Sequence, residues 1–447
     1  MALSFDAVLQ TVLRTCEARP DFANVARATI VRDVRGRVRL ALEVRRETTL
    51  DEAALTADLA AALGDWFAPP ILGENLAADL KRIRSLVFER HEPWADAWYE
   101  EASGAIAVVD SSRWYRLERR LSKLEWLAGE KARLPWPLRE GMPAVATFYS
   151  FKGGVGRTTL VASTALQLAL DGKRVVVVDL DVEAPGVANL LGATPTRGLL
   201  DYLVEHAALG RSSLDDLLAS ATALGREASL VSVVSAGTLD ASYFEKLARL
   251  DFVGAQLDQA QPSPVTAALR ALLTDLAKLS PRPDYILLDS RAGLHDVAGL
   301  SLHDLAHVDV LVGRDSDQGY QGLEMTVMAL GKRRSFDDMR CLVVQTMAPN
   351  DSGSEEYERI TKEYRTRSYG AFVDHVYPKL DDADEQDSPE LDDATAAHYP
   401  AIIEFEPRLM HFTSLTVRRD QLLTADYRAA KERLVALCAP EPKTDEG

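Results

Sequence analysis

The fold of this chain is decided by one stretch, Phe148-Tyr149-Ser150-Phe151-Lys152-Gly153-Gly154-Val155-Gly156-Arg157-Thr158-Thr159. An apolar run over residues 144–149, typical of a buried strand, leads into the glycines, and an apolar-rich segment of helix length, 160–170, follows them. Glycines between a strand and a helix let backbone N–H groups turn inward around a polyphosphate, and the start of the helix adds positive potential. The stretch therefore predicts a phosphate-binding loop in which the hydroxyl of Thr158 is offered to Mg²⁺.

Acidic residues follow two other apolar runs of the chain. The run at 175–178 consists of valines, and Asp179 and Asp181 come directly after it. A second run, 285–288, ends in Asp289 and a turn of small residues. Because the carboxyl ends of parallel strands meet at one edge of a sheet, we expect these carboxylates beside the glycine-rich loop. They are candidates for holding hydrated Mg²⁺ and sensing a γ-phosphate, although carboxylates that only cap strands in solvent would leave the same pattern.

The pattern of residues 143–440 predicts an α/β domain. Short β-branched runs alternate with longer stretches of helical period, as expected for a doubly wound, mostly parallel sheet with helices on both faces. The expected strands are 144–149, 174–179, 230–235, 285–289, 308–312, 341–346 and 372–377. The remainder is expected to hold a mobile acidic loop at 381–393, a final helix at 427–437 and a disordered tail at 441–447.

Residues 1–131 have a different pattern, which predicts a smaller α+β module. Apolar residues at helical spacing indicate helices at 4–19, 50–63, 75–90 and 114–127, and alternation indicates a hairpin with its second arm at 37–45 and a strand at 105–109. Pro135 and Pro137 cannot continue a helix, so 132–142 is the expected linker. We expect the module to bind a protein partner.

Composition and charge limit the possible partners. The 447 residues are 47% hydrophobic and 27% charged, which is ordinary for a globular protein and long enough for two domains. The formal net charge of −17 repels nucleic acid and anionic lipid, except where basic side chains cluster. Without a basic and apolar leader or a run of about 18 apolar residues, we expect a cytoplasmic protein with no membrane tether. The scattered cysteines are expected to be buried thiols rather than a disulfide framework or zinc ligands: Cys16, Cys341 and Cys438.

Together the motifs resemble those of a known family. The segment 152–158 is similar to the deviant Walker A motif of the ParA/MinD-type (SIMIBI) P-loop ATPases, in the variant form KGGVGR, and the two acidic strand ends resemble switch I and switch II of that family. Two further segments, 198–203 and 232–237, resemble stretches found in the same order in the family. The resemblance covers roughly residues 143–437.

The resemblance implies ATP and Mg²⁺ as cofactors and an ATP-sandwich homodimer. Lys152 would be the signature lysine that reaches the nucleotide of the other subunit, and Arg157 would replace the lysine inside the loop. Thr159 would lie near the α-phosphate. The loop residues implied to bind the nucleotide are Gly153, Gly154, Val155, Gly156, Arg157, Thr158 and Thr159.

The same resemblance implies catalytic and metal-binding roles for the acids. Asp181 would orient or activate the attacking water, Asp179 would support the metal shell, and Asp289 would be the Walker B acid, with Thr158 as a direct Mg²⁺ ligand. Residues 345–349 occupy the place where the family contacts the base. Hydrolysis would then depend on Lys152, Asp181 and Arg157.

Two arginines depart from the family pattern. Arg157 is larger and planar, and it forks rather than presenting a point charge, so its exchange with lysine at a crowded phosphate is not conservative. Arg291 stands where many relatives have proline after the Walker B turn. It could sense phosphate, contact a partner, or be an ordinary surface arginine.

These features favour an ATP-dependent switch that dimerises around Mg-ATP, hydrolyses it slowly and relays its state through residues 1–131 to a partner protein. One alternative, suggested by Arg157, is a nucleotide-gated scaffold without turnover. Another is a DNA-associated positioning ATPase of the ParA kind, which the net charge disfavours. Its contacts would be the hairpin arginines, which could equally form a solvated sheet face: Arg32, Arg35, Arg37, Arg39 and Arg45. Three loosely spaced histidines are expected to pack rather than to bind metal: His295, His303 and His307.

Overall fold

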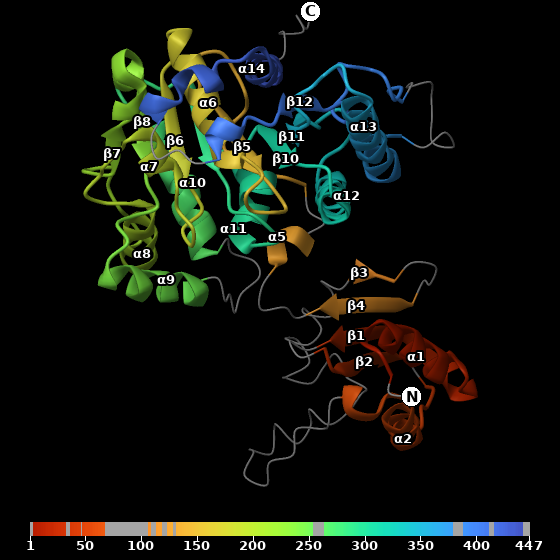
Figure 1. The fold of residues 1–447 in the computed structure, drawn as a ribbon. Coiled ribbons are helices and arrows are strands. Elements are labelled where there is room, and N and C mark those ends of the chain that lie inside the picture. The colour runs from red at the N-terminus through yellow and green to blue at the C-terminus, as the bar shows by residue number, and fades with distance from the viewer. Residues whose placement is uncertain are drawn as a thin grey trace, which may run out of the picture. The chain divides into compact units, whose positions relative to one another are not determined.

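The computed structural model describes residues 3–32, 36–45, 47–67, 106–108, 113–118, 123–127, 131–253, 263–378, 388–410 and 415–440. The chain divides into two compact units, Met1–Leu121 and Ser122–Gly447, each with its own sheet (Figure 1). The division falls earlier than the predicted module end at residue 131, because residues 123–127 and 131–136 pack on the second unit. The predicted helix at 75–90, residues 381–387 of the acidic loop and the tail at 441–447 lie outside the described residues.

The N-terminal unit is a four-stranded sheet with two packed helices. The strand order is β2-β1-β4-β3, and only β1 and β4 pair in parallel. Helices α1 and α2 bury Val8, Val12, Leu55 and Leu59 in a common core with the sheet. The elements are α1 (Phe5–Glu17), η1 (Pro20–Asn24), β1 (Val25–Arg32), β2 (Val38–Val44), α2 (Glu52–Leu63), η2 (Gly64–Trp66), β3 (Ile106–Ala107) and β4 (Trp114–Glu118). The predicted hairpin is β1 and β2.

The predicted helix over 114–127 is wrong. Residues Trp114–Glu118 form β4, and of the described residues in this range only the short α5 (Leu124–Leu127) is helical. The helical period of the charges is overridden because Trp114 is buried, with its ring stacked on that of Phe22 at 5.3 Å, and its strand pairs with β1. Cross-strand packing of this kind outweighs a weak local preference.

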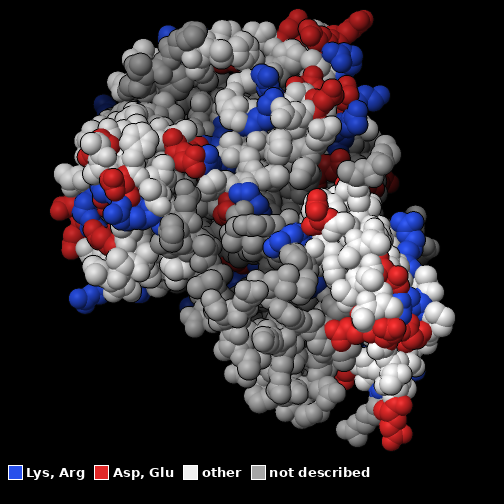
Figure 2. Space-filling model, turned by 90° about the horizontal axis from the view of Figure 1, so that it is seen from below, with Lys and Arg blue, Asp and Glu red and all other residues white. Residues whose placement is uncertain are grey.

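Of the predicted hairpin arginines, Arg32 is withdrawn from solvent, Arg37 and Arg39 are half-buried, and Arg45 is exposed. Arg32 is buried in an ion pair with Glu118 at 2.6 Å, and the Arg27 guanidinium lies 4.2 Å from the centre of the Tyr115 ring. Arg35 is outside the described residues. On the face drawn in Figure 2, basic and acidic side chains of the described residues are interspersed.

The second unit is built on an eight-stranded sheet in the order β12-β11-β10-β5-β9-β6-β8-β7. Every pair is parallel except β7 with β8, so the predicted mostly parallel, doubly wound sheet is confirmed. The strands are β5 (Ala144–Tyr149), β6 (Val175–Asp179), β7 (Leu218–Ser220), β8 (Val231–Val234), β9 (Tyr285–Asp289), β10 (Val308–Gly313), β11 (Cys341–Ala348) and β12 (Ala401–Glu404).

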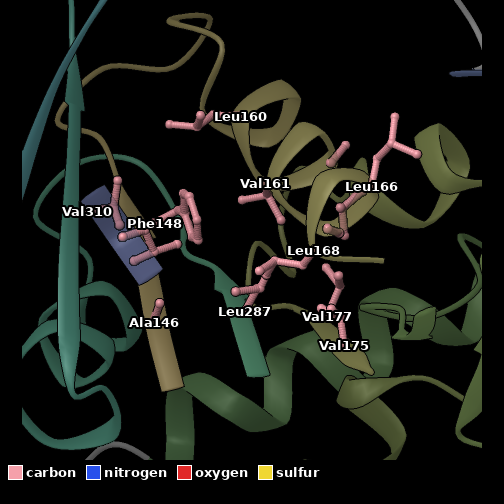
Figure 3. Close-up of a cluster of buried hydrophobic side chains, with 14 of the residues drawn as sticks. Ala146, Phe148, Leu160, Val161, Leu166, Leu168, Val175, Val177, Leu287 and Val310 are labelled. Atoms are coloured by element: carbon pink, nitrogen blue, oxygen red, sulfur yellow. The ribbon is translucent and has the colours of Figure 1, made fainter. Parts of the chain in front are cut away.

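Helices cover both faces of this sheet, because alternate strand residues point to opposite sides. On one face, Ala146 and Phe148 pack with Leu287 and with residues of α6 (Arg157–Leu170), as Figure 3 shows. On the other, Val145 packs beneath α8 and α10. The remaining helical segments are α7 (Val187–Leu191), α8 (Leu199–Leu209), η4 (Thr222–Leu230), α9 (Ala241–Val253), α10 (Pro264–Leu276), α11 (Asp296–Leu300), the π-helical turn η5 (Ser301–Leu305), α12 (Asp317–Gly331), α13 (Glu355–His375), η6 (Pro407–Leu409), η7 (Leu415–Val417), η8 (Arg419–Leu422) and α14 (Ala425–Leu437).

The predicted strand at 372–377 is also wrong, since α13 continues to His375. The aromatic and β-branched residues there suggested a strand, but Tyr364, Ser368, Ala371 and Phe372 are buried at helical spacing. The three cysteines are buried thiols, as predicted. Among the helices that the structure describes, none combines the length and apolar character needed to cross a membrane.

Strand β10 carries a carboxylate into the core. Asp309 is fully buried, with its Oδ2 2.7 Å from NH1 of Arg334. Burial outweighs the favourable effect of Arg334 and raises the pKa of Asp309 to about 7. The folded chain therefore holds a proton that the unfolded chain releases near pH 4, so this group weakens folding as pH rises from about 4 to 7.

We predict that Asp309→Asn flattens this decline, which is of the order of a few kcal/mol for a shift of this size. The free energy of unfolding is measured by urea denaturation at several values between pH 4 and 7. Glu245→Gln, at an exposed carboxylate, is the control and is expected to leave the slope unchanged. An unaltered slope in Asp309→Asn would contradict the assignment.

Candidate functional site

The glycine-rich loop between β5 and α6 faces open space. Gly154 and Gly156 have φ angles of +73° and +82°, which residues with a Cβ rarely adopt. No atom lies within 4 Å of the position that a Cβ would take at Gly153, Gly154 or Gly156. Gly156 caps α6, whose first residue is Arg157, so the unpaired N–H groups of the helix start border the loop. The loop thus provides an open, electropositive cradle of phosphate size.

The sheet brings the predicted acids to this cradle. Strand β9 lies between β5 and β6, and the residue pairing sets Asp289 opposite both Phe148 and Asp179. Asp181 follows in the loop after β6. Asp179, Asp181 and Asp289 are all buried, with exposed fractions of 0, 8 and 1%. Three carboxylates are therefore concentrated in a small, dry volume beside the loop.

Arg157 is the cation that opposes these acids. Its Nε donates to Oδ1 of Asp289 at 2.7 Å and its NH2 donates to Oδ2 of Asp181 at 3.1 Å. NH1 reaches the hydroxyl of Ser150 at 3.4 Å. The planar fork lets one side chain bridge acids from two strand ends, which the single ammonium of a lysine cannot do with the same geometry. The guanidinium is bonded to Asp181 and Asp289, so the phosphate of a nucleotide would have to compete with these carboxylates for it.

Asp179 shapes the loop after β6, which we call switch I (residues 179–186). Its Oδ1 accepts from the N–H of Asp181 and its Oδ2 accepts from the N–H of Gly186, both at 3.1 Å. Burial, followed by the neighbouring Asp289, raises the pKa of Asp179 well above its ordinary value. Both oxygens of Asp179 are thus bonded to the backbone of switch I and hold the shape of this loop.

Asp289 and Thr158 fit a hydrated Mg²⁺. Oδ2 of Asp289 is buried without a well-formed hydrogen bond among the described residues, and the hydroxyl of Thr158 lies close enough to this carboxylate to lower its pKa. A buried oxygen without a partner is costly, and a metal-bound water would satisfy it. Burial raises the pKa of Asp289, an effect that Arg157 opposes. In the described part of the chain no three His, Cys, Asp or Glu side chains form a group that could hold a metal ion by themselves.

Lys152 is half-buried at the entrance of the loop, and none of the ion pairs found among the described residues involves it. Phe151, the residue before Lys152, packs closely on Gly322 of α12. A Cβ at Gly322 would lie 2.1 Å from the Phe151 ring, so only glycine allows this contact. Gly322 therefore sets the position of Phe151. Sequence reasoning missed it, and its only signal was a glycine within a helical pattern.

A shallow recess of about 60 Å³ lies beside Gly156 and Thr159. Of the predicted base contacts at 345–349, Thr346 and Met347 line it, whereas Gln345 is fully buried. Residues after β12 that sequence reasoning missed complete the wall, namely Phe405, Glu406, Leu409 and Met410. Strand β12 was missed because Ala401–Glu404 is only four residues long.

The second departing arginine also contacts an acid. Arg291 forms an ion pair with Glu183 of switch I, and Nε2 of His295 lies 3.5 Å from the same carboxylate. His303 and His307 are buried, and each has a lowered pKa, to about 3 and about 4, mainly because of burial. They pack within the domain. The segment after β9 (residues 289–307), which we call switch II, is thus tied to switch I by Arg291.

The comparisons with known proteins agree with this geometry. The family model described as "CobQ/CobB/MinD/ParA nucleotide binding domain" matches residues 146–387, more than half of the chain. The antiactivator FleN of Pseudomonas aeruginosa is 43% identical over 67 residues, which are 15% of this chain and 22% of FleN. The septum site-determining protein MinD of Helicobacter pylori is 26% identical over 171 residues, 38% of this chain and 51% of that protein. The chain therefore spans only about a fifth to a half of these relatives.

A similar solved structure is the cell division ATPase MinD of Pyrococcus furiosus. It has 19% sequence identity and a TM-score of 0.42, covering 66% of this chain and 98% of that one.

We predict that Arg157→Ala lowers the free energy of unfolding by roughly 3–5 kcal/mol at pH 8, because it leaves buried carboxylates uncompensated. The loss is expected to shrink toward pH 5, since the pKa of Asp289 is raised and the carboxyl takes up a proton. Denaturant unfolding of the nucleotide-free protein measures it. Adding Asp289→Asn to Arg157→Ala should recover part of the stability, and Arg226→Ala is an exposed control. A loss that does not vary with pH would contradict the buried-charge explanation.

Proposed function

The chain belongs to the CobQ/CobB/MinD/ParA nucleotide-binding family, and from this membership we propose that it is an ATP-dependent molecular switch. It binds Mg-ATP, dimerises around it, hydrolyses it slowly and relays the nucleotide state to a partner protein through the N-terminal unit. The observation that carries the proposal is the meeting of Asp179, Asp181 and Asp289 at an open glycine loop, where one oxygen of Asp289 makes no well-formed hydrogen bond to the described residues.

Each part of the site has a role in this proposal. The N–H groups of residues 153–159 hold the phosphates, and Thr158 and Asp289 hold Mg²⁺, directly and through water. The ion neutralises charge on the phosphates. Asp181 orients the water that attacks the γ-phosphate, and the recess beside Met347 takes the base. Lys152, which is not committed to an acid, is available to a nucleotide in a second copy of the chain.

Arg157 gives the switch its resting state. When Arg157 bridges Asp181 and Asp289, the proposed water-orienting acid and the proposed metal acid are both engaged. Mg²⁺ at Asp289 and phosphate near the guanidinium would exchange these ion pairs for new ones. Because the exchange breaks two buried charge-assisted bonds, it is expected to make turnover slow.

The same contact favours a second candidate, a nucleotide-gated scaffold that does not turn over. If Arg157 keeps its bond to Asp181 after ATP binds, no acid is free to orient water. The protein would then bind ATP tightly, change state and release it unhydrolysed.

We predict that Mg-ATP converts the full-length protein to a dimer and that Lys152→Ala abolishes the conversion while monomer binding of ATP persists. Light scattering with size-exclusion chromatography, with and without nucleotide, measures the dimer. Lys173→Ala, at an exposed lysine on the far end of α6, is the matched control. If the dimer content is the same with and without ATP, and the same in Lys152→Ala as in the wild type, the sandwich mechanism is ruled out.

Phosphate release decides between the enzyme and the scaffold. We expect slow, Mg²⁺-dependent release in the wild type, reduced by about 100-fold or more in Asp181→Ala, because a water-orienting group is removed. Asp215→Ala, at an exposed acid, should release phosphate at the wild-type rate. Tight ATP binding without release above background in the wild type would select the scaffold instead.

A further inference from the structure

The residues that lead into the second unit lie on switch II. We call residues 123–127 and 131–136 the connector, since they follow the boundary between the two units at Leu121 and Ser122. Its short helix α5 lies beside α11, the first helix after Asp289 (Figure 1). All of the contacts described below are internal to the second unit.

Trp126 is the main anchor of the connector. Its Nε1 donates to the carbonyl of His295 at 2.8 Å, and the side chain is 8% exposed. The indole packs directly on Gly299 of α11, where an added Cβ would lie 2.8 Å from Nε1. It also contacts the ring of Tyr149, the last residue of β5, with 5.6 Å between ring centres. One side chain therefore touches both switch II and the strand that carries the phosphate loop.

Polar contacts extend this anchor along switch II. The backbone N–H and the ammonium of Lys123 both contact the carboxylate of Asp296. The N–H of Arg133 donates to Oδ1 of Asp304 at 2.9 Å. Further on, Nε2 of His307 bonds the carbonyl of Trp136 at 2.8 Å. The connector thus follows switch II over most of its length after residue 294.

Hydroxyl groups join the same part of switch II to the nucleotide site. The N–H of Ser290, next to Asp289, donates to Phe148, and its hydroxyl lies 2.9 Å from that of Ser301. Ser301 also contacts the hydroxyl of Thr147 in β5 at 3.1 Å. It begins the π-helical turn η5, a rare form of helix that is frequent at functional sites. A shift at Asp289 therefore has a short covalent and hydrogen-bonded route to the connector.

One buried ring at this junction lacks a polar partner among the described residues. His303, in the π turn, is fully buried with its ring edge-on to Trp126 at 5.9 Å. Neither of its ring nitrogens has a hydrogen-bond partner among the described residues. A buried polar group without a partner costs about 1–3 kcal/mol. A rearrangement that gave the His303 ring a hydrogen-bond partner would regain free energy of this order.

We propose that switch II is an intramolecular docking surface for the connector, and that the nucleotide bound at Asp289 sets how firmly the connector is held. The proposal rests on the proposed function, because it needs ATP to bind at this site. It identifies the connector as the element through which the nucleotide state leaves the second unit. In the alternative, these contacts only stabilise the fold, and nucleotide binding does not change how firmly the connector is held.

Amide hydrogen exchange of the full-length protein tests the proposal. Peptides covering 123–136 are followed without nucleotide, with Mg-ADP and with Mg²⁺ and a non-hydrolysable ATP analogue, while fluorescence anisotropy of a labelled analogue reports binding. The N–H groups of Lys123 and Arg133 report the contact directly, since both donate to switch II. We expect exchange in these peptides to change about threefold or more between the nucleotide-free and analogue-bound states.

The two measurements separate the inference from its premise. If the analogue binds and exchange in 123–136 stays the same, the coupling is overturned and the proposed function stands. If the analogue does not bind, both are overturned.

Substitutions then locate the coupling. Gly299→Ala places a Cβ against Trp126 and should abolish the nucleotide-dependent difference in exchange while leaving analogue affinity within about threefold of wild type. Trp126→Phe keeps a ring but removes the bond to His295, and should reduce the difference without unfolding the domain. Gly370→Ala in α13, where no atom lies within 4 Å of the new Cβ, is the matched control. A full difference retained in both Gly299→Ala and Trp126→Phe would overturn the proposal.

Discussion

The second unit depends on one buried ion pair network, in which the guanidinium of Arg157 bridges Asp289 and Asp181. The parallel sheet forces this arrangement, because β6 and β9 are neighbours and deliver their acids to the same edge. Without a cation, carboxylates so deeply buried would repel one another and lose hydration. The arginine at the start of α6 is therefore as much a requirement of the fold as a feature of the nucleotide site.

Arginine at this position does something that lysine does not. Its Nε and NH2 groups diverge, so one residue bonds the acid at the end of β9 and the acid in switch I at once. A lysine would place one charge on whichever acid lay nearer. In the nucleotide-free protein the phosphate loop, switch I and β9 are consequently joined through a single side chain.

The sequence predicted the parts of this chain where local and global preferences agree. Strands β5 and β9 were predicted to the residue, because continuous apolar runs bounded by turn residues leave few alternatives. Trp114 and Phe372 show where this logic fails. Each lies in a segment whose local pattern suits the wrong element, and partners distant in sequence decide: Phe22 and β1 for Trp114, and the packing of α13 for Phe372.

The candidate site shows the same division. The glycines and acids could be predicted because each sits at a strand end, where position in the chain fixes position in space. The direction of the Arg157 side chain could not, since a loop arginine can face phosphate or acid with the same backbone. Gly322 and Phe405 were also out of reach, because they meet the loop only through tertiary packing.

Switch I is held from two sides, and this constrains how the site can open. Arg157, at the end of the phosphate loop, forms an ion pair with Asp181, and Arg291 of switch II forms one with Glu183, two residues further on. If only one of these two ion pairs breaks, the other still holds switch I in place. A phosphate that attracts Arg157 would weaken its ion pair with Asp181. A metal at Asp289 would act, through the end of β9, on the segment that carries Arg291. Nucleotide binding is therefore expected to move switch I and switch II together, as one cooperative step rather than two independent ones.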